Sequence, residues 1–190
     1  SACSWPSASG GAWRNAMETW VEGYALFFSS RNPFGMLPYA LYKAPSQEHP
    51  QCRYRQIGDH LWFRYFLAEN PFGKSGQMSL AAMGLAAAHR VTGRHDLLDL
   101  AHQQLDWILG ANPWMLSLVS GVGVRTPSAL SFLMGNIPGG VTMGPGGNDD
   151  DMPDYRGASH PWMCCDEYYS YQQGHFFWAV TALEALSPNR

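Results

Sequence analysis

The sequence contains little charge. Only 14% of its 190 residues are charged, and 12 basic against 15 acidic residues give a formal net charge of −3. No cluster of Lys and Arg stands out, so the basic footprint of a nucleic-acid-binding protein is excluded. No apolar run reaches the roughly 18–20 residues of a membrane-spanning helix, and no membrane contact is expected. The 46% of hydrophobic residues and the 14% of aromatic residues nevertheless predict a folded, globular chain.

Cysteine is also scarce, and several catalytic motifs are missing. The adjacent Cys164 and Cys165 do not fit the Cys-x-x-Cys spacing of a zinc knuckle, and Cys3 and Cys52 stand alone. We expect small buried hydrophobic residues, with one long-range disulfide as the alternative. There is no GxSxG, no GxxxxGK[ST] and no HExxH, so serine-nucleophile, nucleotide and zinc-protease chemistries have no support.

Helical periodicity is the main structural signal that is present. Apolar residues recur at three- and four-residue steps over 12–28 and over the shorter segment 59–68. A helical hairpin is predicted over two successive segments. The first, 76–93, is rich in Ala and Leu and ends at Gly93; the second, 97–110, has an apolar stripe and ends at Gly110. A final helix is expected over 166–186, with these side chains facing the core: Phe176, Phe177, Trp178, Val180, Leu183 and Leu186.

Glycine and proline are concentrated between the predicted helices. Residues 110–162 hold ten of the 20 glycines and six of the 13 prolines, which excludes long helices and suggests short extended pieces. Residues 32–55, rich in Pro and Tyr, predict a second irregular loop. The predicted fold class is therefore all-α: helical hairpins that carry long Gly/Pro-rich loops at one end. Loops on a rigid helical scaffold are where functional sites usually lie.

Several pieces of the second half of the sequence occur in a characteristic order. After the hairpin come Gly110-Ala111-Asn112-Pro113, the run from Ser117 to Gly123, the Gly-rich loop 138–148, the segment 150–155 and Asp166-Glu167. The first two resemble the "LGxNP…SxVxGxG" run of glycoside hydrolase family 9, and the loop resembles its "GxLxGGPN" motif. The resemblance implies that residues 1–190 are one region, the C-terminal part of an (α/α)6 barrel. It also implies a partner, the missing N-terminal part of the same barrel.

By this resemblance, Glu167 corresponds to the family's catalytic general acid at the mouth of the final helix. Inverting hydrolysis of a glycosidic bond needs a protonated carboxyl and, about 6.5–9.5 Å away, an ionised carboxylate that activates water. The family's base lies in an Asp-rich motif that has no equivalent in the first hundred residues, so the base is expected outside this chain. In the alternative interpretation, Asp166 and Glu167 only favour the positive N-terminal end of a helix.

Aromatic residues around Glu167 are the candidates for binding a carbohydrate substrate. The loop residues Trp114 and Trp162 are expected to stack on sugar rings, with packing of the loops as the alternative. Tyr168 and Tyr171 would desolvate the acid. His175 lies eight residues beyond Glu167, about two helical turns along the same face. It is expected either to hydrogen-bond near the site or to be a buried, satisfied histidine.

The acidic run offers oxygen ligands but no recognised metal-binding pattern. Asn148-Asp149-Asp150-Asp151 and Asp154 present carboxylate and carbonyl oxygens of the kind that calcium prefers. The alternating spacing and the terminal Glu of an EF-hand are missing, so a solvated acidic turn is the preferred interpretation. We predict no metal and no cofactor.

Two other functions remain open at this point. The run Tyr168 to Tyr171 near His160 and His175 is compatible with a polysaccharide lyase that uses Tyr and His as base and acid. The third candidate is a non-catalytic glycan-binding fragment. It is favoured by the missing base and by the stretch 125–132, which lacks the histidines of the family's Pro-His-His-Arg-like segment. The resemblance implies an extracellular or periplasmic location, although no leader is visible.

Overall fold

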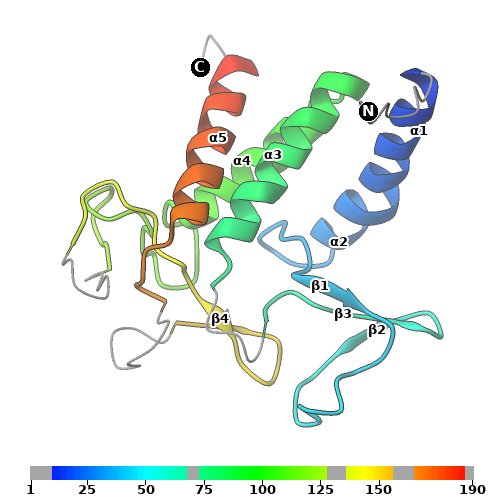
Figure 1. Cartoon of the computed structure of the whole chain (residues 1–190), viewed down its shortest axis with the longest axis horizontal. Coiled ribbons are helices and arrows are strands. Elements are labelled where there is room, and N and C mark those ends of the chain that lie inside the picture. Colours follow the sequence, from blue (N-terminus) through cyan, green and yellow to red (C-terminus); the bar gives the residue numbers. More distant parts are fainter. Residues whose placement is uncertain (1–9, 68–72, 128–135, 156–164, 187–190) are drawn as a thin grey trace, which may run out of the picture.

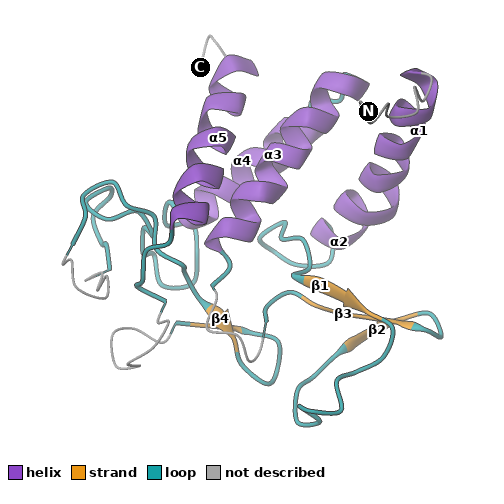
Figure 2. Ribbon diagram, viewed as in Figure 1, coloured by secondary structure: helices purple, strands orange, loops and turns teal. Residues whose placement is uncertain are grey.

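The computed structural model describes residues 10–67, 73–127, 136–155 and 165–186. Its long helices fill one half of the molecule, and the strands and loops fill the other (Figures 1 and 2). The helical elements are α1 (Gly10–Trp20), the π-helical η1 (Val21–Leu26), α2 (Phe27–Ser29), α3 (Ser75–Thr92), α4 (Asp96–Ile108) and α5 (Ser170–Leu186). The strands are β1 (Ala40–Tyr42), β2 (Arg55–Ile57), β3 (Leu61–Arg64), β4 (Gly146–Gly147) and β5 (Pro153–Asp154).

The predicted helical hairpin is confirmed in α3 and α4. Gly93 follows α3 with a φ of 77°, a left-handed conformation that glycine adopts without a steric cost, and its amide donates to His89 O at 2.7 Å. Helix α4 then begins with Asp96 and Asp99 in its first turn, where carboxylates favour the positive end of the helix dipole. Helix α3 packs against both α4 and α5.

The first predicted helix is also confirmed, because α1, η1 and α2 follow one another without a break from Gly10 to Ser29. Its buried residues Val21, Ala25 and Phe28 lie at four- and three-residue steps and pack into the core. Trp20 is partly buried and lies over α3, where a Cβ added at Gly84 would be 3.4 Å from its ring.

The predicted helix over 59–68 is wrong. Residues 61–64 form β3, the central strand of a three-stranded antiparallel sheet with the order β1-β3-β2. Gly58, with a φ of 60°, makes the tight turn that joins β2 to β3. Short aromatic runs suit a strand as well as a helix, and their periodicity alone does not separate the two. The all-α prediction missed this sheet.

The final helix starts later than predicted, and only part of its predicted inward face is buried: Phe176 and Leu183 are, and Leu186 is partly so. It begins at Ser170, so Asp166 and Glu167 precede it. Its buried stripe contains Gln172, Phe176, Ala179 and Leu183, at steps of four, three and four residues. Three residues predicted to face the core lie outside this stripe and are exposed: Phe177 at 59%, Trp178 at 65% and Val180 at 37%.

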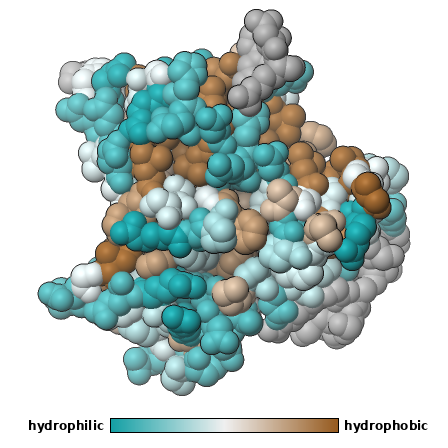
Figure 3. All heavy atoms as spheres, turned by 180° about the vertical axis from the view of Figure 1, so that it is seen from behind, coloured by the Kyte–Doolittle hydropathy of each residue, from teal (hydrophilic) through white to brown (hydrophobic). Residues whose placement is uncertain are grey.

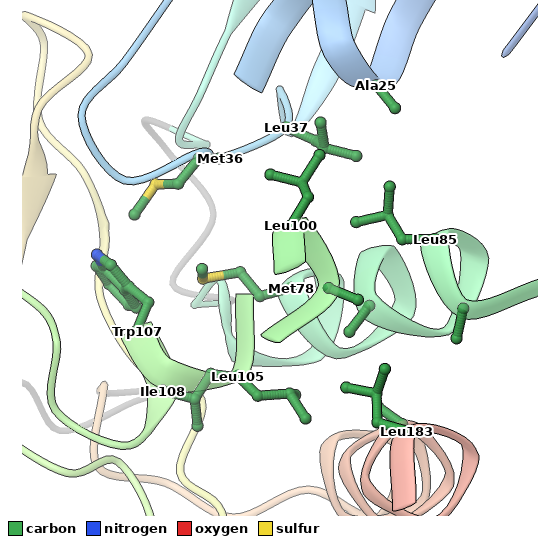
Figure 4. Close-up of a cluster of buried hydrophobic side chains, with 14 of the residues drawn as sticks. Ala25, Met36, Leu37, Met78, Leu85, Leu100, Leu105, Trp107, Ile108 and Leu183 are labelled. Carbon is green, nitrogen blue, oxygen red and sulfur yellow. The ribbon is translucent and has the colours of Figure 1, made fainter. Parts of the chain in front are cut away.

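The hydrophobic core lies where α3, α4 and α5 meet the N-terminal helix. Figure 4 shows side chains from all of these elements converging, among them Leu85, Leu100 and Leu183. Trp107 is fully buried at the end of α4, next to Ile108. The side of the molecule drawn in Figure 3 has its apolar surface mainly in the helical half. Among the helices that the structure describes, none is both long and apolar enough to cross a membrane.

Two of the cysteines fall within the described ranges. Cys52 and Cys165 are both buried, as predicted for small hydrophobic residues. The Sγ of Cys52 lies 3.5 Å from Asp149 Oδ1. Cys3 and Cys164 lie outside the described residues.

Candidate active site

Three segments that the sequence motifs singled out lie side by side in the loop half. Val119 pairs with Val141, and Thr142 pairs with Tyr168, both as antiparallel bridges. The amide of Thr142 donates to Leu118 O at 2.8 Å, and that of Met143 donates to Glu167 O at 2.9 Å. The Gly-rich loop therefore forms a central extended segment, with the "SxVxGxG"-like run on one side and Glu167 on the other.

The same loop is fixed to the start of α3 by close backbone contacts. The amide of Ser75 donates to Met143 O at 3.0 Å. A Cβ added at Gly73 would lie 1.9 Å from Gly144 O, and one added at Gly144 would lie 2.4 Å from Ser75 Oγ. Glycine is needed at both positions because any side chain would push the loop off the helix. Because Met143 is hydrogen-bonded both to Ser75 and to Glu167 O, this contact also fixes the position of the Glu167 segment relative to α3.

Glu167 is buried in this arrangement, with 8% of its surface exposed. Its Oε2 is buried and has no hydrogen-bond partner among the described residues. Burial raises the pKa of the Glu167 carboxyl above its ordinary value, because the charged form loses solvation. The side chain is therefore not on the exposed surface, and its environment favours the protonated carboxyl more than water does.

Asp166, the neighbour of Glu167, is held by an aromatic chain that the sequence analysis missed. Tyr155 donates a short hydrogen bond from its hydroxyl to Asp166 Oδ1. The Tyr155 ring lies 5.6 Å from the Trp114 ring, which in turn lies 6.3 Å from Trp107 in the core. The partly buried Trp114 therefore connects the core to the residue beside the candidate acid. The only sequence signal for Tyr155 was its place in the segment 150–155.

The structure places the other predicted binding residues unevenly. Tyr168 holds two loop segments together, because its hydroxyl lies 2.5 Å from Ser120 Oγ and 3.0 Å from Asn136 Oδ1. Tyr171, in the first turn of α5, is 38% exposed. Its ring centroid lies 5.8 Å from that of His175, whose Nδ1 is buried without a hydrogen-bond partner in the described part of the chain. Glu167 precedes α5, so the same-face argument for His175 does not apply. Trp162 lies outside the described residues.

The acidic run contains one residue that the sequence analysis misjudged. Asp149 and Asp150 are exposed, as expected for a solvated turn, but Asp151 is buried with a φ of 61°. Asp151 Oδ2 accepts a hydrogen bond from Arg55 Nε at 2.9 Å, and Oδ1 accepts one from the Phe66 amide at 3.0 Å. The Nε of the fully buried Arg64 lies 3.9 Å from Oδ1. Asp151 thus fastens the acidic turn to the sheet.

Arg64 completes this fastening with backbone contacts. Its Nε donates to Phe66 O at 3.1 Å, and its two terminal nitrogens donate to Arg53 O at 2.7 Å and Asn148 O at 2.6 Å. Within the ranges that the structure describes, no three His, Cys, Asp or Glu residues are placed to hold a metal ion. Nothing in the sequence indicated that Asp151, unlike its two neighbouring aspartates, is buried, because Arg55 and Arg64 are distant from it along the chain.

Lys74 is a second buried charge that the sequence did not reveal. It immediately precedes α3 and is 1% exposed, and its Nζ donates to Leu37 O at 2.8 Å and to Tyr65 O. Burial lowers the pKa of Lys74 to about 7, and the charge of Asp151 opposes that change. The amine therefore connects the start of α3 to the segments that precede β1 and follow β3, and it is charged mainly below about neutral pH.

The buried amine predicts a pH-dependent stability. Its pKa is about 7 in the folded protein against an ordinary value of 10.5, so between these values the unfolded state binds more protons than the folded state. The free energy of unfolding should therefore rise with pH above 7, by at most about 1.4 kcal/mol per pH unit. Urea denaturation of the intact protein at pH 7, 8 and 9 measures this slope. Lys74→Met should remove it and Lys43→Met, an exposed control, should retain it; equal slopes in all three proteins would contradict the assignment.

Comparison with solved structures identifies the class of fold. A structure titled Bacteroides ovatus GH9 matches 93% of this chain with a TM-score of 0.60 and 16% identity. At this identity the match speaks for the fold alone. The helices in one half and the loops in the other thus have the fold of part of that structure.

The sequence places the chain in the same family. Residues 38–133 match glycosyl hydrolase family 9, so the chain belongs to this family. It spans 29% of the length of the Bacteroides ovatus structure. No functionally curated protein matches the sequence. Glu167 lies beyond the matched segment, so its role depends on the motifs and the geometry.

Two further structures are similar over a smaller part of the chain. The catalytic domain of Clostridium thermocellum CelT matches 64% of this chain and 27% of its own length, with a TM-score of 0.49 and 16% identity. The endoglucanase CelQ from Clostridium thermocellum, complexed with cellobiose and cellotriose, matches 66% of this chain and 23% of its own, with a TM-score of 0.47 and 19% identity.

Proposed function

We propose that this chain is the C-terminal part of an inverting glycoside hydrolase that cleaves a β-linked oligo- or polysaccharide. Glu167 is its general acid, and the aspartate that activates water lies outside this chain. The observation that carries the proposal is the buried Glu167 carboxyl at the junction of the three motif segments, with an Oε2 that has no partner among the described residues. Family membership supplies the reaction class.

The environment of Glu167 suits the acid role. A general acid must hold its proton at the working pH and release it to the leaving oxygen. Burial raises the pKa of Glu167 and so favours the protonated form. The Oε2 is buried and accepts no hydrogen bond from the described residues, so no described donor stabilises the charged form at this oxygen. A carboxylate that only stabilised a helix end would instead accept hydrogen bonds from that helix, and Glu167 precedes α5 by three residues.

Exposed apolar side chains support the proposal that more of the barrel packs here. Phe177 and Trp178 on α5 are 59% and 65% exposed, and Leu80 on α3 is 45% exposed. α3 and α5 are packed neighbours, so these side chains give the helical half an uncovered apolar surface. The occupant that fits is the N-terminal part of the same barrel, since the chain spans only 29% of the matched structure. An extracellular or periplasmic location is part of the same proposal.

The lyase alternative has one observation in its favour and one against it. Tyr171 and His175 are brought together on α5, with ring centroids 5.8 Å apart. However, burial raises the pKa of Tyr171, and a tyrosine that acts as a base needs a lowered one. The glycan-binding alternative differs from hydrolysis only in the absence of products.

Product analysis tests the proposal directly. We expect the intact protein to release reducing ends from cellotetraose, and proton NMR at early times should show the α-anomer at the new end, as inversion of a β-linkage requires. First appearance of the β-anomer would overturn the inverting mechanism. Ultraviolet absorbance of unsaturated uronic products, from a uronate polymer, would indicate the lyase instead. Calorimetric binding of cellotetraose without any reducing-end release would indicate the binding fragment.

A further inference from the structure

A hollow lined by arginine lies between the sheet and the end of α2, apart from Glu167. Its volume is about 530 Å³, which is within the range of small-ligand sites. Arg31, Arg53 and Arg55 line it, and no lining residue is acidic. The remaining walls are mainly aromatic and apolar, from Phe27, Tyr54, Ile57 and Phe63, with Gln56.

The arginines outnumber the carboxylates around the hollow. Asp151 is already shared, because it accepts from Arg55 Nε at 2.9 Å and lies 3.9 Å from Arg64 Nε. Asp149 lies close by, since its backbone O accepts a hydrogen bond from the Arg53 amide at 2.6 Å, and its negative charge also counts against the arginines. No ion pair to a described acidic residue is formed by Arg31 or Arg53. The hollow therefore has an excess of positive charge that an anion would neutralise.

One of these guanidinium groups is held in place before any ligand arrives. Arg31 lies over the Phe27 ring, with its Cζ 3.5 Å from the ring centroid, and its Nη1 donates to Phe27 O at 2.5 Å. Its other nitrogens remain as donors. A planar guanidinium that is stacked on a ring loses little freedom when it binds a carboxylate or a sulfate.

A second, smaller hollow shares two of the arginines. Its volume is about 190 Å³, and Arg31 and Arg55 line it together with apolar side chains such as Phe34, Met36 and Met152. Asp151 also lines it, but its carboxylate is paired with Arg55 at 2.9 Å. The two guanidinium groups thus lie between a wider basic hollow and a narrower, mainly apolar one. A ligand that joins an anionic group to a body with an apolar face fits this arrangement. A pyranose ring that carries a carboxylate or a sulfate ester has that chemistry, because its C–H face matches an aromatic or apolar wall.

We propose that these adjoining hollows bind an acidic sugar residue, whose oxyanion is held by Arg31 and Arg53. The identity of the ligand as a sugar depends on the proposed hydrolase function; the anion preference depends only on the arginines. The site gives the protein a preference for glycans that carry acidic groups, at a position separate from the candidate acid.

The test compares neutral and acidic forms of one oligosaccharide. Calorimetry of the intact protein measures binding of cellotetraose, of its C6-carboxylated form and of its C6-sulfated form. We expect at least one acidic tetramer to bind about tenfold more tightly than cellotetraose at low salt, with the preference shrinking as salt screens the charges. The two acidic probes distinguish carboxylate from sulfate recognition.

Matched variants locate the effect. Arg53→Gln removes a guanidinium that forms no ion pair with a described acidic residue, and the double variant Arg31→Gln/Arg53→Gln should abolish the preference for the acidic tetramers. Arg90→Gln, in the last turn of α3, makes the same charge change elsewhere and should keep it. Equal binding of all three tetramers by the unaltered protein, or an unchanged preference in the double variant, would overturn the proposal. Preferential binding of inorganic sulfate over the sulfated tetramer would exclude the sugar-recognition part.

The outcome is separable from that of the proposed function. A protein that binds the acidic tetramer selectively but cleaves no glycoside contradicts the hydrolase proposal and supports this site. A protein that cleaves cellotetraose and binds the three tetramers equally contradicts only this site.

Discussion

Replacing Glu167 by Gln in the intact protein should lower kcat for natural glycosides by about 10³-fold, the middle of the range of about 10²–10⁴ for loss of general acid catalysis. The glutamine amide keeps the size of the side chain but supplies no acidic proton to the leaving oxygen. A factor of that size corresponds to about 4 kcal/mol of transition-state stabilisation. Initial rates of reducing-end release from cellotetraose measure the change.

The leaving group provides an internal check on the role of Glu167. An aryl cellobioside with a dinitrophenolate leaving group needs no protonation, so Glu167→Gln should slow its cleavage far less than that of cellotetraose. Glu184→Gln, an exposed glutamate on the same helix α5, is the matched control and should leave both rates unchanged. Near-normal cleavage of cellotetraose by Glu167→Gln would remove Glu167 from the mechanism. Equal losses on both substrates would mean a structural role.

The pH profile gives a second readout of the same group. A general acid works only while protonated, so activity should fall as pH rises through the pKa of Glu167, which burial places above its ordinary value. In Glu167→Gln this alkaline limb should disappear from the residual activity.

The second large effect is expected at Asp151, where Asp151→Asn should lower the free energy of unfolding by about 3–5 kcal/mol. The carboxylate is fully buried and compensates Arg55 and the fully buried Arg64. Without its charge, the guanidinium of Arg64 stays desolvated beside a neutral amide. Urea denaturation of the intact protein, followed by circular dichroism, measures the loss.

Asparagine separates the charge from the backbone conformation in this experiment. Asp151 has a φ of 61°, and asparagine tolerates this left-handed region as well as aspartate does. Asp150→Asn is the matched control, because the neighbouring residue is exposed and loses the same charge. It should change stability by no more than about 0.5 kcal/mol. Equal effects of the two substitutions would show that Asp151 does not carry the attachment of the acidic turn.

Local signals predicted some elements well and others poorly. The hairpin of α3 and α4 followed from its composition and from Gly93, because a glycine C-cap and strong helix formers act within a few residues. The aromatic run from Leu61 to Arg64 was wrongly predicted to be helical. Pairing with the strand at residues 40–42 decides its conformation, and these partners are too distant in sequence for a local pattern to reveal.

The candidate site shows the same division. The ordered motifs led to Glu167, and the structure brings those motifs together around it. They gave no sign of Tyr155 beside Asp166, of the buried amine of Lys74 or of the arginines that surround Asp151. Each of these depends on which side chain from a distant segment fills the space beside it.

The sequence alone thus determined the helical hairpin, the Gly-rich loops and the likeness to a family, since propensity, capping and motif order are properties of neighbouring residues. Only the tertiary structure decided which charges are buried. Asp149, Asp150 and Asp151 are chemically identical, yet only the last enters the interior. The cost of removing a carboxylate from water is offset only where arginines and an amide converge on it, and that convergence comes from the folded chain.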